Sequence, residues 1–345
     1  MSWHSVRGHE QVFEGLRGLL ASRRLPHALL FVGPSGIGKR TFARTFAKAL
    51  LCDRNPGDTL DACGSCAGCL QVEAKTHPDL LEVQRPEDRQ ELPIRLIRQL
   101  RDEFGLKPAR GRRRIAIVDD AEDFNDEAAN ALLKTLEEPP PGSVLILIAT
   151  SAETVLPTLV SRCHVIRFSP LPVEPLAEVL TERGLAPDAE SARRLASLAE
   201  GSVARAIDLG DPELERFRRQ LIDEVSAPAG FDPSVVAERV AGYLAQAAKD
   251  HPTKRRHAGL LVGELARLFR GTLWTTAGLE SPSPDPRERQ AAAALAQRLE
   301  PEDVFLLADR CLLAEHQLHR NVYLPLVFES LFHDLGRTLN RRVHP

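Results

Sequence analysis

The sequence has few aromatic residues, no strong net charge and no long apolar run. Aromatic residues make up 5% of the 345 residues, and the formal net charge is −3. A chain so close to neutral is not a general polyanion binder, so contact with nucleic acid would need a local basic patch. The N-terminal segment lacks the apolar core of a secretion signal, and no apolar run approaches the length of a membrane span. We therefore expect a cytoplasmic protein that does not cross a membrane.

The chain also lacks an internal repeat and an even spread of cysteines. Of its six cysteines, four are clustered, and Cys163 and Cys311 are isolated. This is not the pattern of a secreted disulfide scaffold. With 43% hydrophobic and 27% charged residues, the composition is that of an ordinary globular protein. The length is sufficient for two or three domains.

A glycine-rich turn between an apolar run and a segment of helical spacing is the most specific pattern present. Ala28–Val32 predicts a buried strand, and the residues after Gly38 have apolar positions at helical spacing. The backbone N–H groups of such a turn can surround an anion, and the helix start adds positive potential. This is the context of a phosphate-binding loop. The predicted nucleotide-binding residues of the turn are Gly33, Pro34, Ser35, Gly36, Ile37, Gly38, Lys39, Arg40 and Thr41.

The residue after Lys39 departs from this pattern. The motif has Ser or Thr there, whose hydroxyl ligates Mg²⁺, whereas this chain has Arg40. Thr41 comes one place later, and consecutive residues of a helix are turned by about 100°, so Thr41 does not replace the missing hydroxyl. We therefore expect nucleotide binding without metal-dependent hydrolysis. The alternative is a glycine-rich turn that binds nothing.

The four clustered cysteines have the spacing of metal ligands. Cys63, Cys66 and Cys69 follow one another at intervals of three, and Cys52 lies upstream. Four thiolates can close a tetrahedron around Zn²⁺ and leave no open position, so we predict a structural zinc site. The alternative is a loop with four free thiols. A surface position is expected for His77, which follows the cluster, rather than a role as a fifth ligand.

Two further apolar runs end in polar residues. The run IAIV is followed by Asp119 and Asp120, which resembles the second nucleotide motif, with Asp119 holding the water shell of Mg²⁺. Hydrolysing enzymes usually have Glu at the next position, and Asp120 is one methylene shorter. The alternative is a strand followed by an acidic helix cap. Thr150 ends the run that begins at Ser143, at the edge where doubly wound sheets place ligand contacts.

Strands and helices alternate up to about Phe168, which predicts a three-layer α/β domain with a parallel sheet. Beyond Pro172 the apolar residues follow only helical spacing, which predicts helical domains.

Four segments in this order resemble the clamp-loader branch of the AAA+ ATPases, in particular the delta-prime type of subunit of the bacterial DNA polymerase III clamp loader. They are Arg24–Phe31, the four-cysteine insert, Asn130–Pro139 (NALLKTLEEP) and Leu159–Cys163 (LVSRC). The resemblance implies a P-loop NTPase (AAA+) domain, a small helical lid and an all-α collar that holds a ring together. The expected domains are 1–168 with the zinc insert at 52–69, then 169–210 for the lid and 211–345 for the collar.

The resemblance also implies roles for single residues. Arg162, in the Ser161–Cys163 motif, would be a catalytic arginine finger that reaches the ATP of a neighbouring subunit and stabilises charge on its γ-phosphate. Considered without the resemblance, Arg162 is expected to be a surface residue or a member of an intrachain salt bridge. Motor subunits of the family carry Gly-Ser-x-Arg in the lid. Here that position is Ala204, and Arg205 comes one residue later.

These departures favour a non-hydrolysing subunit that helps to load the sliding clamp onto primed DNA. Zinc would be structural, ATP or ADP is the candidate ligand of the loop, and a role for Mg²⁺ is in doubt. The implied partners are gamma/tau-type motor subunits and the delta subunit, the sliding clamp indirectly or transiently, and primer–template DNA through the complex. One alternative is the ATP-hydrolysing motor subunit of the same loader. Another is a zinc-containing nucleic-acid-binding protein acting alone, which the basic run Lys107–Arg114 suggests.

Overall fold

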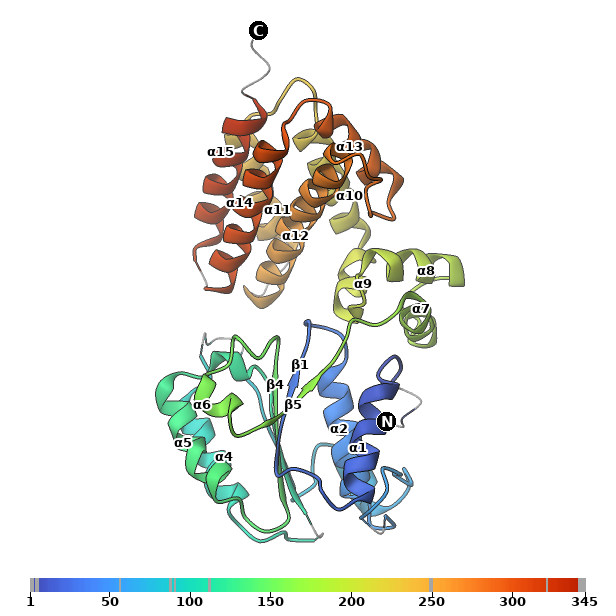
Figure 1. Cartoon of the computed structure of the whole chain (residues 1–345), viewed down its shortest axis with the longest axis vertical. Coiled ribbons are helices and arrows are strands. Elements are labelled where there is room, and N and C mark those ends of the chain that lie inside the picture. The colour runs from blue at the N-terminus through green and yellow to red at the C-terminus, as the bar shows by residue number, and fades with distance from the viewer. Residues whose placement is uncertain are drawn as a thin grey trace. The chain divides into compact units, whose positions relative to one another are not determined.

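The computed structural model describes residues 3, 6–55, 57–86, 89, 91–110, 113–247, 251–320 and 322–340. The chain forms two compact units, Met1–Ala204 and Arg205–Pro345. The first contains the sheet, and the second is helical (Figure 1). In the described part of the chain, no helix combines the length and the apolar character that a bilayer crossing requires.

The first unit is built on a five-stranded sheet with the order β2-β3-β4-β1-β5. All four strand pairs are parallel. Because β1, β3 and β4 run parallel, the loops that follow them emerge at the same end of the sheet. The strands are β1 (Ala28–Val32), β2 (Leu80–Val83), β3 (Arg114–Val118), β4 (Ser143–Ala149) and β5 (His164–Arg167).

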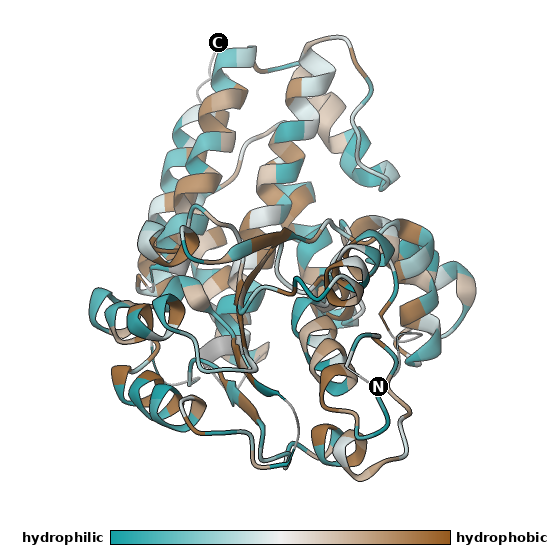
Figure 2. Ribbon diagram, turned by 60° about the horizontal axis from the view of Figure 1, so that its bottom comes forward, coloured by the Kyte–Doolittle hydropathy of each residue, from teal (hydrophilic) through white to brown (hydrophobic). Residues whose placement is uncertain are grey.

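Helices cover both faces of this sheet, which confirms the predicted three-layer arrangement (Figure 1). In β1, Leu29 and Phe31 pack into one core cluster with Phe42 and Phe46 of α2, while Leu30 faces the other cluster. A strand buried on both faces explains the continuous apolar run, and Figure 2 colours the strands brown between the helical layers. The covering helices are α1 (Glu10–Ala21) and α2 (Lys39–Leu50) on one face, and α4 (Ile94–Phe104), α5 (Asp126–Glu137) and α6 (Pro157–Val160) on the other.

Short helices complete the first unit. In α3 (Ala67–Glu73) the cysteine cluster has a helical part that the sequence did not predict. The short 3-10 helix η2 (Ala121–Asp123) follows β3. After β5 come α7 (Val173–Glu182), α8 (Ala189–Leu198) and α9 (Val203–Leu209). The boundary of the two units falls inside α9, so the expected division at 168 and 210 stays a prediction.

The second unit is all-helical, as predicted from the change in periodicity. Its core is formed by aromatic and aliphatic residues such as Phe269, Phe328 and Phe332, which are fully buried. In Figure 1, α11, α12, α14 and α15 lie side by side. The helices are α10 (Pro212–Val225), α11 (Pro233–Ala247), α12 (His251–Thr276), α13 (Pro286–Ala296), α14 (Pro301–His319) and α15 (Leu324–Leu339).

A charge network lies inside this helical unit. Arg218 of α10 is 1% exposed, and its guanidinium contacts Glu215, Glu264 of α12, and Asp285 and Glu288 beside and within α13. The carboxylates hold the pKa of Arg218 above its usual value even though burial acts in the opposite direction. Buried charges are tolerated only when they are paired and hydrogen-bonded, so this network ties three helices together.

Candidate functional site

The turn after β1 has three glycines with positive φ angles. The φ angles of Gly33, Gly36 and Gly38 are 152°, 76° and 97°, a region that residues with a side chain rarely adopt. At Gly33 a Cβ atom would lie 2.4 Å from the carbonyl oxygen of Phe168. The glycines are therefore required by the path of the chain, and α2 begins directly after them at Lys39.

Lys39 is directed into its own loop. Its side chain is 7% exposed, and Nζ donates hydrogen bonds to the carbonyl oxygens of Gly33 at 2.6 Å and Pro34 at 2.8 Å. Burial lowers the pKa of Lys39, and the neighbouring carboxylates partly oppose this. The ammonium group is thus bonded to backbone oxygens of the loop that precedes it.

Arg40 and Asp119 are brought together across the sheet edge. The Nη1 atom of Arg40 lies 3.6 Å from a carboxylate oxygen of Asp119. Arg40 also donates to the side chain of Gln84. Burial raises the pKa of Asp119, Asp120 raises it further, and Arg40 lowers it. Arg40, which replaces the usual hydroxyl, thus faces Asp119, the acid of the second motif. The two positions that the motifs associate with Mg²⁺ contact each other.

Asp120 and Thr150 lie on the neighbouring strand ends, as expected. Asp120 has a positive φ of 57°, which makes it an irregular link to η2. The carbonyl oxygen of Thr150 accepts a hydrogen bond from the N–H of Gly33 at 3.1 Å. The N–H of Thr150 donates to Oε1 of Glu122 at 3.1 Å. The structure therefore brings the predicted segments together, with backbone contacts at Thr150.

The segment Ser202–Ala204 contacts the glycine-rich turn directly within the first unit. The N–H of Val203 donates to the carbonyl oxygen of Gly36 at 2.9 Å. A Cβ atom at Gly36 would lie 2.3 Å from Oγ of Ser202 and 2.7 Å from Cβ of Ala204. The position at which motor subunits of the resembled family carry Arg is thus packed against the loop as alanine. Arg205 instead contacts Glu264 of the helical unit at 2.7 Å.

Two residues of this region, His9 and Glu122, were not predicted. The ring of His9 is 5% exposed, and its Nε2 atom is hydrogen-bonded to the carbonyl oxygen of Ile37 at 2.8 Å. Burial lowers the pKa of His9. No sequence signal indicates His9, which lies far upstream of the loop. Glu122 follows Asp120 by two positions in the sequence. Its nearness to Asp119 and Asp120 was the signal that could have indicated it as a residue of this region.

The four cysteines form one cluster at the other end of α2. The sulfur atoms of Cys52, Cys63, Cys66 and Cys69 all lie within 4.8 Å of one another. Two of the sulfur–sulfur distances are 3.8 and 4.0 Å. A zinc–sulfur bond of about 2.3 Å gives a tetrahedron edge of about 3.8 Å, so this donor set fits a tetrahedral zinc ion. His77 lies outside this group.

Backbone N–H groups surround the sulfur atoms. The N–H of Cys66 points to the sulfur of Cys63 at 3.3 Å, and the N–H of Cys69 points to that of Cys66 at 3.4 Å. Backbone hydrogen bonds, that from Ser65 first, lower the pKa of Cys63 to about 6, while burial raises the pKa of Cys69. Such donors stabilise thiolates, the form that binds metals.

The residues around the cluster show that the surface position expected for His77 is wrong. The nucleic-acid role suggested for the basic run Lys107–Arg114 stays untested. His77 is 5% exposed rather than at the surface, and its Nδ1 atom accepts from the N–H of Asp79 at 3.0 Å. Asp79, fully buried, accepts from the N–H groups of Ala109 and Arg110. The basic run is thus held as a turn, although Gly111 and Arg112 lie outside the described residues.

Arg162 lies at the surface, directly after α6. Its Nε and Nη2 atoms contact one oxygen of Glu137 at 3.0 and 2.7 Å, and Nη1 donates to the carbonyl oxygen of Thr158 at 3.0 Å. Its side chain is 36% exposed. Arg162 is therefore both at the surface and in an intrachain salt bridge with Glu137, the two alternatives expected without the resemblance. The guanidinium remains partly accessible.

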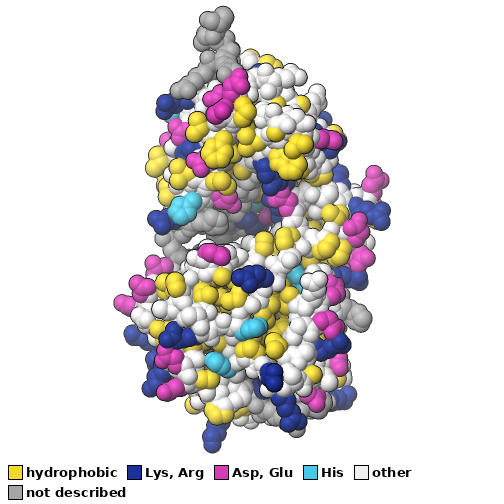
Figure 3. Space-filling model, in the orientation of Figure 1, with side chains coloured by type: hydrophobic (Ala, Val, Ile, Leu, Met, Phe, Trp, Pro, Cys, Tyr) yellow, Lys and Arg dark blue, Asp and Glu magenta, His cyan; other side chains and the backbone are white. Residues whose placement is uncertain are grey.

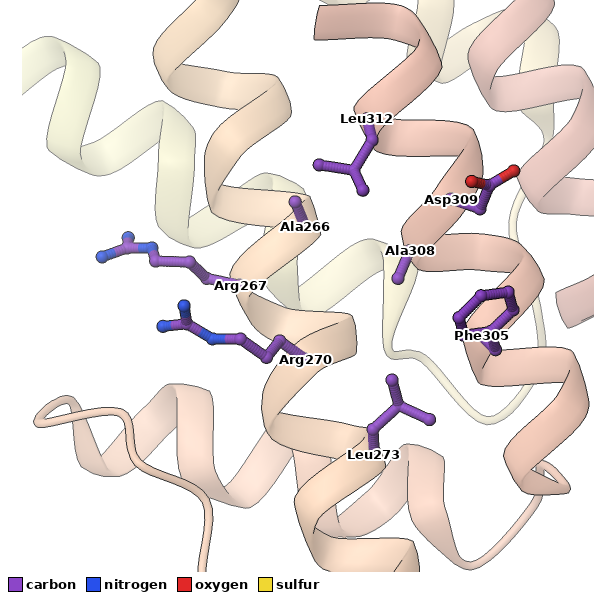
Figure 4. A pocket seen from close by; sticks show the side chains of 8 residues that line it. All are labelled: Ala266, Arg267, Arg270, Leu273, Phe305, Ala308, Asp309 and Leu312. Atoms are coloured by element: carbon purple, nitrogen blue, oxygen red, sulfur yellow. The ribbon is translucent and has the colours of Figure 1, made fainter. Parts of the chain in front are cut away.

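The helical unit has an exposed apolar groove between α12 and α14. Phe305 is 63% exposed and Leu312 is 57% exposed, and Figure 3 shows apolar side chains on this face. Figure 4 shows Leu273, Phe305 and Leu312 lining the groove, with Arg270 projecting from the far side of α12. The groove has a volume of about 280 Å³, and its apolar lining is typical of a contact surface.

Comparison with known proteins relates the first unit to DNA polymerase III. Residues 8–172 match the family described as DNA polymerase III, delta subunit. The chain is 40% identical over 207 residues to subunit delta′ of Pseudomonas aeruginosa, which covers 58% of this chain and 60% of that protein. For subunit delta′ of Bacillus subtilis the identity is 32% over 224 residues, covering 64% and 66%. For subunit tau of Escherichia coli it is 35% over 210 residues, covering 60% and 32%.

The chain thus spans about one third of the length of the tau subunit and about 60% of the delta′ subunit of Pseudomonas. Among solved structures, a gamma subunit-related protein of Thermotoga maritima aligns with 95% of this chain and 99% of its own, at 17% identity and a TM-score of 0.40. The identities to delta′ and tau are similar, so they do not distinguish these two subunits.

Proposed function

We propose that the chain is a clamp-loader subunit of the delta-prime type, a proposal supported by the match of residues 8–172 to the family described as DNA polymerase III, delta subunit. In this role it does not hydrolyse ATP. It helps a neighbouring motor subunit to place the sliding clamp on primed DNA, and donates Arg162 to the ATP of that neighbour. It assembles with gamma/tau-type and delta subunits, and meets primer–template DNA through the complex.

The observation that carries the proposal is the ion pair between Arg40 and Asp119. In a hydrolysing loop a hydroxyl and an acid at these positions hold Mg²⁺, which neutralises charge in the transition state. Here a guanidinium is present in place of the hydroxyl and engages the acid. Ala204 against Gly36 supports the same conclusion, since no guanidinium from that position reaches the loop.

The finger role is supported by the position of Arg162. It follows a short helix, is partly exposed, and is held by Glu137 and the carbonyl oxygen of Thr158. A held guanidinium loses less conformational freedom when it meets a phosphate. In trans, such a group stabilises the charge that develops on the γ-phosphate.

The remaining parts have structural roles. Zinc bound by Cys52, Cys63, Cys66 and Cys69 stabilises a segment between α2 and β2 that has little apolar core of its own. In the helical unit, the groove that includes Phe305 and Leu312 supplies apolar surface for assembly.

The proposal is tested by ATP turnover of the isolated chain and of the loader reconstituted with gamma/tau-type and delta subunits. The isolated chain should show negligible turnover. Arg162→Ala should lower hydrolysis at the site it serves by about 10³-fold, the lower end for arginine fingers, and leave assembly intact. Arg167→Ala, which removes an exposed guanidinium from β5, is the matched control. Normal turnover with Arg162→Ala would refute the finger role.

The motor subunit of the same loader is the second candidate. It is favoured by the intact glycine conformations, by the place of Lys39 and by the similar identity to tau. Mg²⁺-dependent hydrolysis by the isolated chain, abolished by Lys39→Ala, would establish it and would exclude the non-hydrolysing role.

A further inference from the structure

One oxygen beside the phosphate loop is not accounted for by the roles above. Glu122 uses Oε1 to accept the N–H of Thr150. Its Oε2 atom is buried and has no hydrogen-bond partner among the described residues. A buried carboxylate oxygen without a partner costs free energy, so the charge needs another source of stabilisation.

Hydrogen bonds through the backbone lead from Glu122 to the cation of the loop. Thr150 accepts the N–H of Gly33, and Gly33 accepts a hydrogen bond from Nζ of Lys39. A continuous series of contacts thus joins the carboxylate to the ammonium group. Among the carboxylates around Lys39, Glu122 acts most strongly to raise its pKa, against the larger effect of burial.

We propose that Glu122 is a resident anion of the phosphate loop, which neutralises Lys39 and thereby weakens the binding of nucleotide phosphates. A phosphate that enters the loop must share Lys39 with this carboxylate, and Asp119 and Asp120 lie in the same region. In a partly buried site, repulsion between like charges is weakly screened. The loop therefore keeps its shape without a ligand, and Glu122 sets its affinity for one.

The sharpest test is Glu122→Gln. Glutamine keeps the shape and an oxygen that accepts the N–H of Thr150, but removes the charge. ATP binding to the purified full chain is measured by calorimetry at pH 8, with and without Mg²⁺. We expect Glu122→Gln to bind ATP about tenfold more tightly than the unaltered chain in both conditions, a difference of about 1.4 kcal/mol.

The matched control is Asp123→Asn. Asp123 is on the same short helix, and its carboxylate is paired with Arg85 at 2.6 Å, so loss of its charge should leave ATP affinity within about twofold, since no carboxylate is removed from Lys39. Thermal melts of both variants verify folding. If Glu122→Ala unfolds the chain, Glu122→Gln still decides. Equal ATP affinities of the folded Glu122→Gln variant and the unaltered chain would overturn the proposal.

A second outcome would also overturn it. If the unaltered chain hydrolyses ATP and Glu122→Gln abolishes the turnover, Glu122 acts as a general base and not as a competing anion. The inference rests on the proposed function only in that nucleotide is the ligand class of the loop. The role of Glu122 is tested by ATP binding to the isolated chain, whereas the finger role of Arg162 is tested by turnover in the assembled loader. The two proposals can therefore fail separately.

Discussion

Helix α2 has a candidate ligand site at each end, and the two sites differ in completeness. At its C-terminal end, Cys52 joins three other thiols within 4.8 Å, a donor set that fits a metal. At its N-terminal end, the loop keeps glycine conformations and Lys39, but its charges are engaged by Gly33, Pro34 and Asp119. The comparison teaches that a site can retain the backbone of its motif while its side chains satisfy one another.

The largest effect is expected at the cysteine cluster. Cys69→Ser should abolish stoichiometric zinc binding and strongly lower the melting temperature, because structural zinc contributes about 10–16 kcal/mol in zinc-finger peptides near pH 7. Zinc content by atomic emission and a thermal melt are the measurements. Cys163→Ser, which alters a partly buried thiol outside the cluster, is the control. One zinc per chain retained in Cys69→Ser would remove the difference between the two ends of α2.

The next effect concerns Lys39. Lys39→Ala should lower the free energy of unfolding by about 2 kcal/mol, since hydrogen bonds of charged groups each contribute about 1.5–3 kcal/mol, and two backbone oxygens lose their donor. Urea unfolding measures the change. If the free energy of unfolding is unaltered and only ATP affinity falls, Lys39 binds the ligand, and its hydrogen bonds to the loop do not stabilise the fold.

A smaller change is expected for Arg40→Thr. The guanidinium is 39% exposed, so loss of its ion pair should change the free energy of unfolding by less than about 1 kcal/mol. Freed Asp119 and the new hydroxyl should make ATP affinity depend on Mg²⁺. Calorimetry with and without Mg²⁺ measures this, and Arg17→Thr, from an exposed pair with Glu14, is the control. Mg²⁺-independent affinity in Arg40→Thr would contradict the role given to Arg40.

The last expected effect is a pH dependence at Asp123. Burial raises the pKa of Asp123 from 3.8 to about 6. The folded chain therefore binds more protons than the unfolded chain between these values, so this group makes stability fall as pH rises through that range. Asp123→Asn should lack this contribution. Urea unfolding at pH 4 and pH 6 compares the unaltered chain with Asp123→Asn. Identical pH profiles of the two would exclude a raised pKa of Asp123.

The sequence predicted the parts of the molecule that local spacing determines. The apolar run Ala28–Val32 became a central strand, and the periodicity after Pro172 became helices. The cysteine cluster was predicted because thiols at intervals of three, joined by Cys52, can reach one metal. In each case the signal lies in a short segment, and burial or ligation acts on that segment directly.

The remainder depends on residues that are distant in the sequence. Burial of His77 follows from the packing of the segment before β2, and the contact of His9 with Ile37 joins the N-terminal segment to the loop. The ion pair of Arg40 exists because β3 ends next to α2. Such pairings are set by sheet order, and the periodicity of one segment does not specify them. The roles of Arg162 and of the loop in binding nucleotide stay predictions.

The charge network around Arg218 has a consequence for how this helical unit can change in evolution. Replacing Arg218 alone would leave Glu264 and Glu288 as buried anions with fewer partners, whereas exchanging the whole set for apolar residues is often neutral. Relatives should therefore keep these residues together or lose them together. Arg205 also contacts Glu264, at 2.7 Å, so loss of Glu264 would leave Arg205 without this partner as well, and substitutions in α12 should be accompanied by changes in α9 and α10.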